Sequence, residues 1–363
     1  MQRPDTLRRS VGWDIGGAHV KACLLEDGAV RDIAQWPCPL WQGLAHLEAT
    51  IAVARARWPQ GWEAHTVHAA TMTGEMVDLF ADREDGVWRL TAVLAEALGP
   101  SLRLFAGQPA GGPAWVAPPD VAQHWAAIAS ANWCATAALV AARVADAVLV
   151  DIGSTTTDLI ALRGGHVATH GNTDAQRLAS GALVYQGVVR TPLCALARRV
   201  PFGGEQVNVL NEFFATTADV YRLTGELAAA HDQQPSADQA AKDTAATRQR
   251  LARMIGRDAG DAPADAWLAL ARFWRGEQLG EIAGQLARVI RASGVPRDAP
   301  LVAAGCGDFL VAELAAQTGR PLLRFAGDVV ALPDISDTSD LSGWTQVCAP
   351  AVAVALLASS AEA

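Results

Sequence analysis

Hydrophobic positions along the chain follow strand and helix periodicities in turn. Short apolar runs favour strands over 65–71 and 102–105, and another before the glycines near 305. Segment 230–240 is polar and poor in bulky apolar residues, so we expect a surface loop there. Apolar residues at helical spacing predict helices over 43–58, 87–98, 121–144, 174–181, 216–223, 245–255, 264–274, 279–293, 309–318 and 349–359. Strands mixed with helices in this order predict an α/β protein.

The chain contains a duplication. Segments 12–30 and 149–167 align without a gap at an offset of 137 residues, and both contain Asp-Ile-Gly. Each copy reads as strand, tight polar turn, strand, glycine turn and strand. We therefore expect two related domains, each of which opens with a β-hairpin. The predicted parts are 1–145, 146–345 and a C-terminal helix, 346–363, that packs back on the body.

Composition and charge exclude several classes of protein. Of the 363 residues 51% are hydrophobic, which is enough for two packed domains. The net charge of −9 argues against a nucleic-acid partner. The six cysteines form no C-x-x-C pair, which favours a reducing compartment. Residues 1–10 lack the pattern of a signal peptide, and the apolar stretch 121–144 is interrupted by polar residues, so we expect a cytoplasmic protein that does not bind membranes.

The duplicated turns carry the candidate chemistry. An Asp at the end of a buried strand, followed by glycine or small hydroxyl residues, places a carboxylate beside exposed backbone N–H groups. That combination suits phosphate oxygens and a divalent cation, and two facing copies would clamp a polyphosphate. The alternative is that each Asp-Ile-Gly is an ordinary hairpin turn. A third glycine turn, at Gly305 and Gly307, favours the first interpretation.

Three short segments connect the chain to a known superfamily. Asp-Ile-Gly-Gly-Ala-His-Val-Lys (14–21), Asp-Ile-Gly-Ser-Thr-Thr-Thr-Asp (151–158) and Ala-Ala-Gly-Cys-Gly-Asp (303–308) resemble the phosphate 1, phosphate 2 and adenosine motifs of the actin/Hsp70/sugar-kinase (ASKHA) superfamily. Within it the chain most resembles the hydantoinase/oxoprolinase-related branch linked to tetrahydromethanopterin-dependent one-carbon metabolism. The likeness extends to 71–78, 131–136, 185–192, 214–221 and 242–258. It implies an actin-like ATPase fold with two ribonuclease-H-like domains around a central cleft.

The resemblance also implies an activity. In methanofuran biosynthesis a transferase of this kind joins γ-glutamyltyramine to (5-(aminomethyl)furan-3-yl)methyl diphosphate, which gives an aryl ether and pyrophosphate. The phosphate turns would then bind the substrate's diphosphate with Mg²⁺. Cys306 and Asp308 depart from the glycine-rich adenosine loop, which weakens the alternative of an ATP-dependent kinase or amidohydrolase. A second alternative is a non-catalytic, actin-like regulatory ATPase. A homo-oligomer is compatible with each of these.

Displacement at a furanylmethyl carbon requires neutralisation of the leaving diphosphate and a base for the phenol. Asp14 and Asp151 are the candidate Mg²⁺ ligands and catalytic carboxylates, with turn capping as the alternative. Lys21 is the candidate charge partner of the leaving group, unless it is an exposed strand lysine. Candidate phosphate donors are Gly16, Gly17, Ala18, His19, Gly153, Ser154, Thr155, Thr156, Gly305 and Gly307.

The remaining candidates lie in the segments between these turns. Glu75 follows a predicted strand and is a candidate general base, although a first-turn helix position would also favour glutamate. Thr73 is a candidate substrate contact at the same strand end. Arg177 and Arg190 are candidate ligands of diphosphate or the glutamyl carboxylate, with surface salt bridges as the alternative. Tyr185 and Asp219 complete the predicted substrate-binding set.

Overall fold

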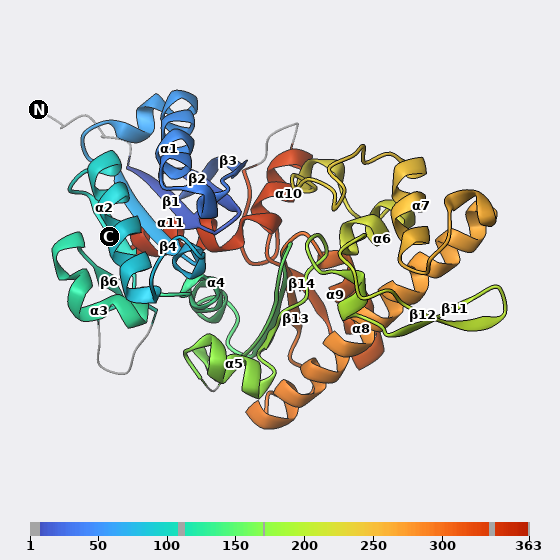
Figure 1. The fold of residues 1–363 in the computed structure, drawn as a ribbon. Helices are drawn as coiled ribbons and strands as arrows, with labels where there is room; N and C mark the ends of the chain where they lie inside the picture. The colour runs from blue at the N-terminus through green and yellow to red at the C-terminus, as the bar shows by residue number, and fades with distance from the viewer. Residues whose placement is uncertain (1–7, 108–112, 170, 334–337, 362–363) are drawn as a thin grey trace, which may run out of the picture. The chain divides into compact units, whose positions relative to one another are not determined.

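The structure is a computed structural model that describes residues 8–107, 113–169, 171–333 and 338–361 (Figure 1). The predicted lack of a signal peptide concerns residues 1–10, of which 1–7 lie outside the described residues. The chain divides into two compact units. Unit 1 consists of Met1–Ala145, Leu162–Val167 and Arg324–Ala363, and unit 2 consists of Asp146–Ala161 and Ala168–Leu323.

Unit 1 is built on a six-stranded mixed sheet with the order β3-β2-β1-β4-β5-β6. β1, β2 and β3 form an antiparallel meander, and β4 and β5 extend the sheet parallel to β1. The strands are β1 (Arg9–Ile15), β2 (His19–Glu26), β3 (Ala29–Pro37), β4 (Val67–Met72), β5 (Leu102–Phe105) and β6 (Trp115–Val116). The central strands β1 and β4 are almost entirely buried, as apolar strands in the middle of a covered sheet must be.

Helices cover this sheet and supply the rest of the unit 1 core. They are α1 (Ala45–Arg57), α2 (Arg83–Leu98), α3 (Val121–Ile128), α4 (Asn132–Ala141), α10 (Thr338–Val347) and α11 (Ala349–Ala361). α2 begins at an Asp82 cap whose side chain accepts a hydrogen bond from the Asp85 backbone N–H, and it ends at Gly99, which has a positive φ. Both helix ends are therefore encoded locally.

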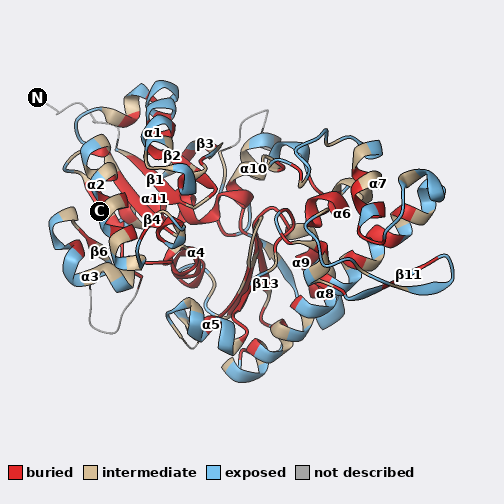
Figure 2. Ribbon diagram, viewed as in Figure 1, coloured by how far each residue is buried: buried red, intermediate tan, exposed pale blue. Residues whose placement is uncertain are grey.

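The predicted second domain, 146–345, ends too late. Residues from Arg324 onward belong to unit 1, because α10 packs on β3 and α11 packs on β1 and β4. Gly12 in β1 makes this possible: a Cβ atom there would lie 2.0 Å from the Ala351 carbonyl oxygen. Figure 2 shows α11 buried along most of its length. The C-terminal helix thus packs back on the N-terminal sheet.

The predicted helix over 121–144 is wrong in one respect, because two helices, α3 and α4, occupy this stretch. The break lies at Ser130, whose φ of 52° is in the left-handed region. Its hydroxyl donates a 2.7 Å hydrogen bond to Glu75 Oε1. A contact 55 residues away in sequence therefore stabilises a turn that local apolar periodicity does not reveal.

Unit 2 repeats the arrangement of unit 1 in abbreviated form. The second sheet, most of which lies in unit 2, has the order β10-β8-β7-β13-β14, with β9 paired to β8. The strands are β7 (Ala147–Ile152), β8 (Thr157–Arg163), β9 (His166–Val167), β10 (Leu183–Val184), β13 (Leu301–Ala304) and β14 (Leu322–Arg324). β7 and β8 correspond to β1 and β2, and β13 runs parallel to β7 as β4 does to β1. The predicted duplication is therefore present in the sheets.

The helices of unit 2 are α5 (Asp174–Ser180), α6 (Thr217–Thr224), α7 (Thr244–Arg253), α8 (Ala264–Ser293) and α9 (Asp308–Thr318). A separate hairpin pairs β11 (Arg199–Phe202) with β12 (Glu205–Asn208). The two helices predicted over 264–293 are one 30-residue helix. Gln278, in the expected break, is buried and bonded to Tyr221 and to the Gly187 carbonyl, and this holds the helix intact there.

Segment 230–240, expected to be a surface loop, is partly internal. Asp232 and Ser236 are buried. Asp232 pairs with Arg222 and Lys242, and Asp238 pairs with Arg250. Its polar residues are therefore partners for nearby cations, one of which, Arg250, is buried. Across the described residues, no single helix has the length and apolar character to cross a membrane, although the sharply bent pair α10–α11 passes that test jointly.

Candidate functional site

The first phosphate turn connects β1 to β2 in unit 1. The Gly16 N–H donates to the His19 carbonyl at 3.0 Å, and the Gly17 carbonyl accepts from the Leu40 N–H at 3.1 Å. A Cβ atom on Gly16 would lie 2.9 Å from His19 O, and one on Gly17 would lie 2.7 Å from a methyl of Val77. Backbone therefore crowds position 16, whereas a Cβ atom at position 17 would have to displace the Val77 side chain.

The second phosphate turn connects β7 to β8 in unit 2. The Gly153 N–H donates to the Thr156 carbonyl at 2.9 Å, which reproduces the Gly16–His19 bond at the same offset of the duplication. The Ser154 carbonyl accepts from the backbone N–H groups of both Val189 and Arg190. Segment 187–190 thus stabilises the turn through backbone hydrogen bonds.

A further equivalence joins each turn to the loop after the neighbouring parallel strand. The Ile15 carbonyl accepts from the Thr73 N–H at 2.9 Å, and the Ile152 carbonyl accepts from the Gly307 N–H at 2.8 Å. Thr73 in unit 1 therefore corresponds to the third glycine turn of unit 2. The structure brings Thr73 to turn 1 and the 305–307 loop to turn 2.

Lys21 lies across from Asp14 in the β1–β2 register. Its Nζ is 3.9 Å from Asp14 Oδ2 and donates a 3.2 Å hydrogen bond to the Val347 carbonyl at the end of α10. Asp14 is buried and Lys21 is half-buried. A helix C-terminus favours a nearby cation, so α10 helps to hold the ammonium group beside the turn.

Asp151 is half-buried and rests against the third glycine turn. A Cβ atom on Gly305 would lie 2.5 Å from Asp151 Oδ1 and 2.2 Å from the Ile152 carbonyl oxygen, and Gly305 has a φ of +84°. Only glycine fits this position. Cys306, which follows it, is buried, and Asp308 begins α9.

Arg190 is the predicted substrate residue that the structure brings onto turn 2. Its backbone N–H bonds to the Ser154 carbonyl at 2.9 Å, and its Nη1 lies 3.5 Å from the Thr155 hydroxyl. The guanidinium is exposed. The cation therefore stands beside the hydroxyls and backbone of the turn, where an anion can reach it.

Glu75 occupies a different environment from the one expected of a general base. Its side chain is 1% exposed, and its Oε1 accepts from the Ser130 hydroxyl, which also accepts from Arg83 Nη2 at 3.0 Å. Gly86 of α2 packs directly on the Glu75 backbone. The carboxylate thus links the loop after β4 to the start of α2 and to the α3–α4 break.

Arg177 and Asp219, like Glu75, are buried; both belong to unit 2. Arg177 is buried and pairs with Asp158 and Asp174. Burial raises the pKa of Asp158, and the Arg177 charge opposes that shift. Asp219 is buried between Arg250 and Arg222, at 2.7 and 2.8 Å, and burial raises its pKa against the effect of both cations. Tyr185, in contrast, is 62% exposed after β10.

The predicted metal ligands are one carboxylate in each unit, Asp14 in unit 1 and Asp151 in unit 2. Among the described residues, no group of three or more His, Cys, Asp or Glu side chains is arranged to hold a metal ion. Mg²⁺ commonly takes one or two protein carboxylates and completes its shell with water and phosphate oxygens. Each turn therefore contributes one carboxylate as a candidate Mg²⁺ ligand.

Two structural residues of the site were missed by sequence analysis. Gly187 is so close to turn 2 that a Cβ atom would lie 2.4 Å from Ser154 C and from Thr155 N. An isolated glycine in the stretch 185–192 is a signal that could have indicated it. Ser130 carries no comparable signal, because its importance comes from a left-handed backbone and a distant partner.

A family model for hydantoinase/oxoprolinase matches residues 66–321. The chain belongs to the hydantoinase/oxoprolinase family. The family match includes the second phosphate turn and the 305–307 loop but begins after the first turn. Turn 1 is recognised instead by its equivalence to turn 2.

Two curated relatives carry the name (4-{4-[2-(γ-L-glutamylamino)ethyl]phenoxymethyl}furan-2-yl)methanamine synthase. The protein from Methanocaldococcus jannaschii is 29% identical over 250 residues, which are 68% of this chain and 72% of the relative. The protein from Methanococcus vannielii is 44% identical over 73 residues, which are 20% of this chain and 32% of that protein.

The fold of this hydantoinase/oxoprolinase family member is also found in a solved structure. The nucleotide-free structure of acetone carboxylase matches with a TM-score of 0.51 and 10% identity, over 84% of this chain and 66% of that one. A ROK family glucokinase from Streptomyces griseus covers 96% of this chain and 98% of its own, with a TM-score of 0.48 and 12% identity. The predicted α/β, actin-like ATPase (ASKHA) fold class is confirmed.

Proposed function

We propose that this protein is a transferase of methanofuran biosynthesis that forms an aryl ether from γ-glutamyltyramine and (5-(aminomethyl)furan-3-yl)methyl diphosphate. The observation that carries the proposal is the match to the M. jannaschii synthase over 72% of that protein. The name of that relative describes a product in which an –O–CH₂– bridge joins the phenyl and furan rings. The bond to be made is therefore between a phenol oxygen and a furanylmethyl carbon.

In the proposed reaction the phenol oxygen attacks the methylene carbon, and the bond from this carbon to the diphosphate oxygen breaks. The diphosphate leaves with the electron pair as pyrophosphate, and the phenolic proton passes to water. The phenol oxygen is itself the nucleophile, so the reaction needs none from the protein. The contribution expected from the enzyme is orientation of the reactants and stabilisation of negative charge on the leaving group.

The two turns suit this task because each offers a carboxylate beside a closely packed glycine, Gly16 in turn 1 and Gly187 against turn 2. In the proposal, each turn binds phosphate oxygens, and Asp14 and Asp151 hold Mg²⁺, which would supply positive charge to the leaving diphosphate. Lys21 and Arg190 add cations at turns 1 and 2 respectively. Glu75 positions the loop after β4 through Ser130, since a carboxylate that is 1% exposed does not offer itself to a phenol.

The test is an incubation of the purified protein with Mg²⁺ and both substrates, in which pyrophosphate release and the mass of the product are followed. Asp14→Asn and Asp151→Asn are the test variants, and Asp298→Asn, at an exposed carboxylate outside the turns, is the matched control. Ether and pyrophosphate formed without ATP, and lost only in the two turn variants, support the proposal.

The same turns fit the phosphates of ATP, so ATP hydrolysis is measured in parallel. Substrate-stimulated ATP cleavage without ether formation would overturn the proposal and favour an ATP-dependent kinase or amidohydrolase. Nucleotide binding without turnover of either kind would instead favour a regulatory ATPase. Each of the three results therefore favours a different one of the three candidate functions: transferase, ATP-dependent enzyme or regulatory ATPase.

A further inference from the structure

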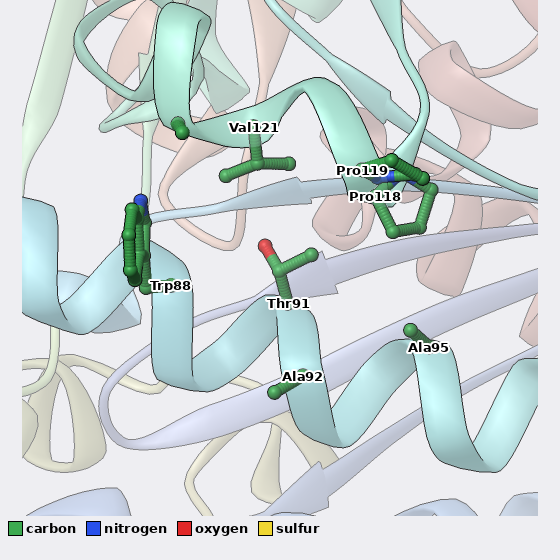
Figure 3. Close-up of a pocket in the computed structure, with 8 residues that line it drawn as sticks. Trp88, Thr91, Ala92, Ala95, Pro118, Pro119 and Val121 are labelled. Atoms are coloured by element: carbon green, nitrogen blue, oxygen red, sulfur yellow. The ribbon is translucent and has the colours of Figure 1, made fainter.

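A small apolar pocket lies on unit 1 between α2 and the segment that leads into α3. Its volume is about 290 Å³. The residues that line it are Trp88, Thr91, Ala92, Ala95, Pro118, Pro119, Val121 and Ala122. Figure 3 shows the Trp88 ring at one end and the two prolines at the other. None of these residues belongs to the phosphate turns.

Two features of the pocket point to a ligand. Trp88 is a large aromatic side chain at the rim of the pocket, and it is 51% exposed. Thr91 is only 5% exposed, and its Oγ1 forms no hydrogen bond with any described residue. Figure 3 shows the Thr91 side chain directed from α2 toward Val121, with its oxygen on the side of Trp88.

The Thr91 hydroxyl forms no such bond with a described residue, although a threonine in a helix can bond to the carbonyl one turn earlier, as Thr50 does with His46 O at 2.7 Å. A buried hydroxyl without a partner costs free energy that a bound polar group would recover. Apart from the indole N–H of Trp88 at the rim, the lining is otherwise apolar, so the Thr91 hydroxyl would orient a ligand that is mostly hydrophobic.

We propose that this pocket binds a monocyclic aromatic molecule with one hydroxyl group, its ring against Trp88 and its hydroxyl bonded to Thr91 Oγ1. The volume suits this class, since a cavity of about 150 Å³ accommodates benzene. No charged side chain lines the pocket, so it does not recruit the diphosphate or carboxylate groups of the proposed substrates. The site is independent of the proposed ether synthesis.

The probes are 4-fluorophenol and fluorobenzene, followed by ¹⁹F NMR titration of the full chain. Thr91→Val removes the hydroxyl at nearly constant volume. Thr136→Val is the matched control, because Thr136 Oγ1 is also buried without a hydrogen bond among the described residues but does not line the pocket. Trp88→Ala removes the ring. Thermal unfolding of each variant verifies that it is folded.

We expect saturable binding of 4-fluorophenol to the unmodified protein and to Thr136→Val with equal Kd. Thr91→Val should weaken it about fivefold, the value of one hydrogen bond, and leave fluorobenzene unaffected. Trp88→Ala should weaken both probes. The proposal is overturned if neither probe saturates, if Thr136→Val loses as much affinity as Thr91→Val, or if Thr91→Val and Trp88→Ala both bind 4-fluorophenol as the unmodified protein does.

Discussion

Lys21 and Asp158 occupy equivalent positions in the duplicated hairpin and carry opposite charges. Lys21 lies 3.9 Å from Asp14 Oδ2, whereas Asp158 is paired with the buried Arg177. The two turns therefore share their backbone hydrogen bonds but differ in charge beside them. Unit 1 presents a half-buried cation at its turn, and unit 2 uses the equivalent position for an internal ion pair and brings Arg190 to its turn instead.

This difference predicts a specific role for Lys21. Lys21→Met should lower kcat/KM for the proposed ether synthesis by about 10²-fold, because a preorganised charge beside a leaving group contributes on that order. Lys21→Arg should retain part of the activity. Initial rates of pyrophosphate release measure the effect, and thermal unfolding reports on stability. Activity that stays within twofold of the unmodified enzyme would show that Lys21 does not act on the leaving group.

Arg190 should affect binding without affecting folding. Its guanidinium is exposed, while its backbone bond to Ser154 O is independent of the side chain. Arg190→Ala should therefore raise the KM for the diphosphate about tenfold, the value of one charge-assisted hydrogen bond, and leave the melting temperature unchanged. Arg199→Ala, at an exposed arginine on β11, is the control. An equal rise in KM for both variants would point to net charge as the cause.

Gly187 should be sensitive to the smallest substitution. A methyl group there would lie 2.4 Å from Ser154 C, so Gly187→Ala should displace turn 2 and destabilise the protein by about 1–3 kcal/mol. Gly276→Ala is the matched control: it lies inside α8 with open space around it, and it should stabilise the helix by about 0.5–1 kcal/mol. Denaturant unfolding compares the two, and equal effects would contradict the steric argument.

Local sequence patterns predicted the parts of the fold that depend on neighbouring residues. The strands that contain Asp14 and Asp151 follow from the alternation of apolar and polar residues. The glycine turn after each of these strands follows from the composition of the turn. The breaks in the helices were predicted less well, because Ser130 ends a helix through Glu75 and Gln278 keeps one continuous through Tyr221. These partners are distant in sequence, so periodicity contains no information about them.

The candidate site also contains residues that the sequence could locate and residues whose role depends on contacts distant in sequence. Arg190 was predicted as a ligand of the diphosphate or the glutamyl carboxylate, and it lies on turn 2. Glu75 was selected for its place after a predicted strand, but burial and ion pairing decide what a carboxylate can do, and both Glu75 and Asp219 are internal. The correspondence of Thr73 with Gly307 depends on parallel strand pairing, which only the folded sheets reveal.

His68 on β4 predicts a pH dependence of stability. It is 2% exposed, and its Nδ1 accepts a 3.2 Å hydrogen bond from Trp13 Nε1, so the folded protein holds it neutral. Burial lowers its pKa from 6.5 to about 4. Because the unfolded chain binds this proton more readily, the contribution of His68 is complete above pH 6.5 and declines as the pH falls toward about 4.

The predicted loss between these limits is at most about 3 kcal/mol, from about 1.4 kcal/mol per unit of pKa shift. Denaturant midpoints measured from pH 7.5 to 4 should fall with pH in the unmodified protein. His68→Asn retains an acceptor for Trp13 and removes the titration, so it should be less stable at pH 7.5 because of lost packing but show a flatter decline below pH 6.5. Parallel declines in the two proteins would mean that other groups, such as the buried ion pairs of unit 2, cause the acid sensitivity.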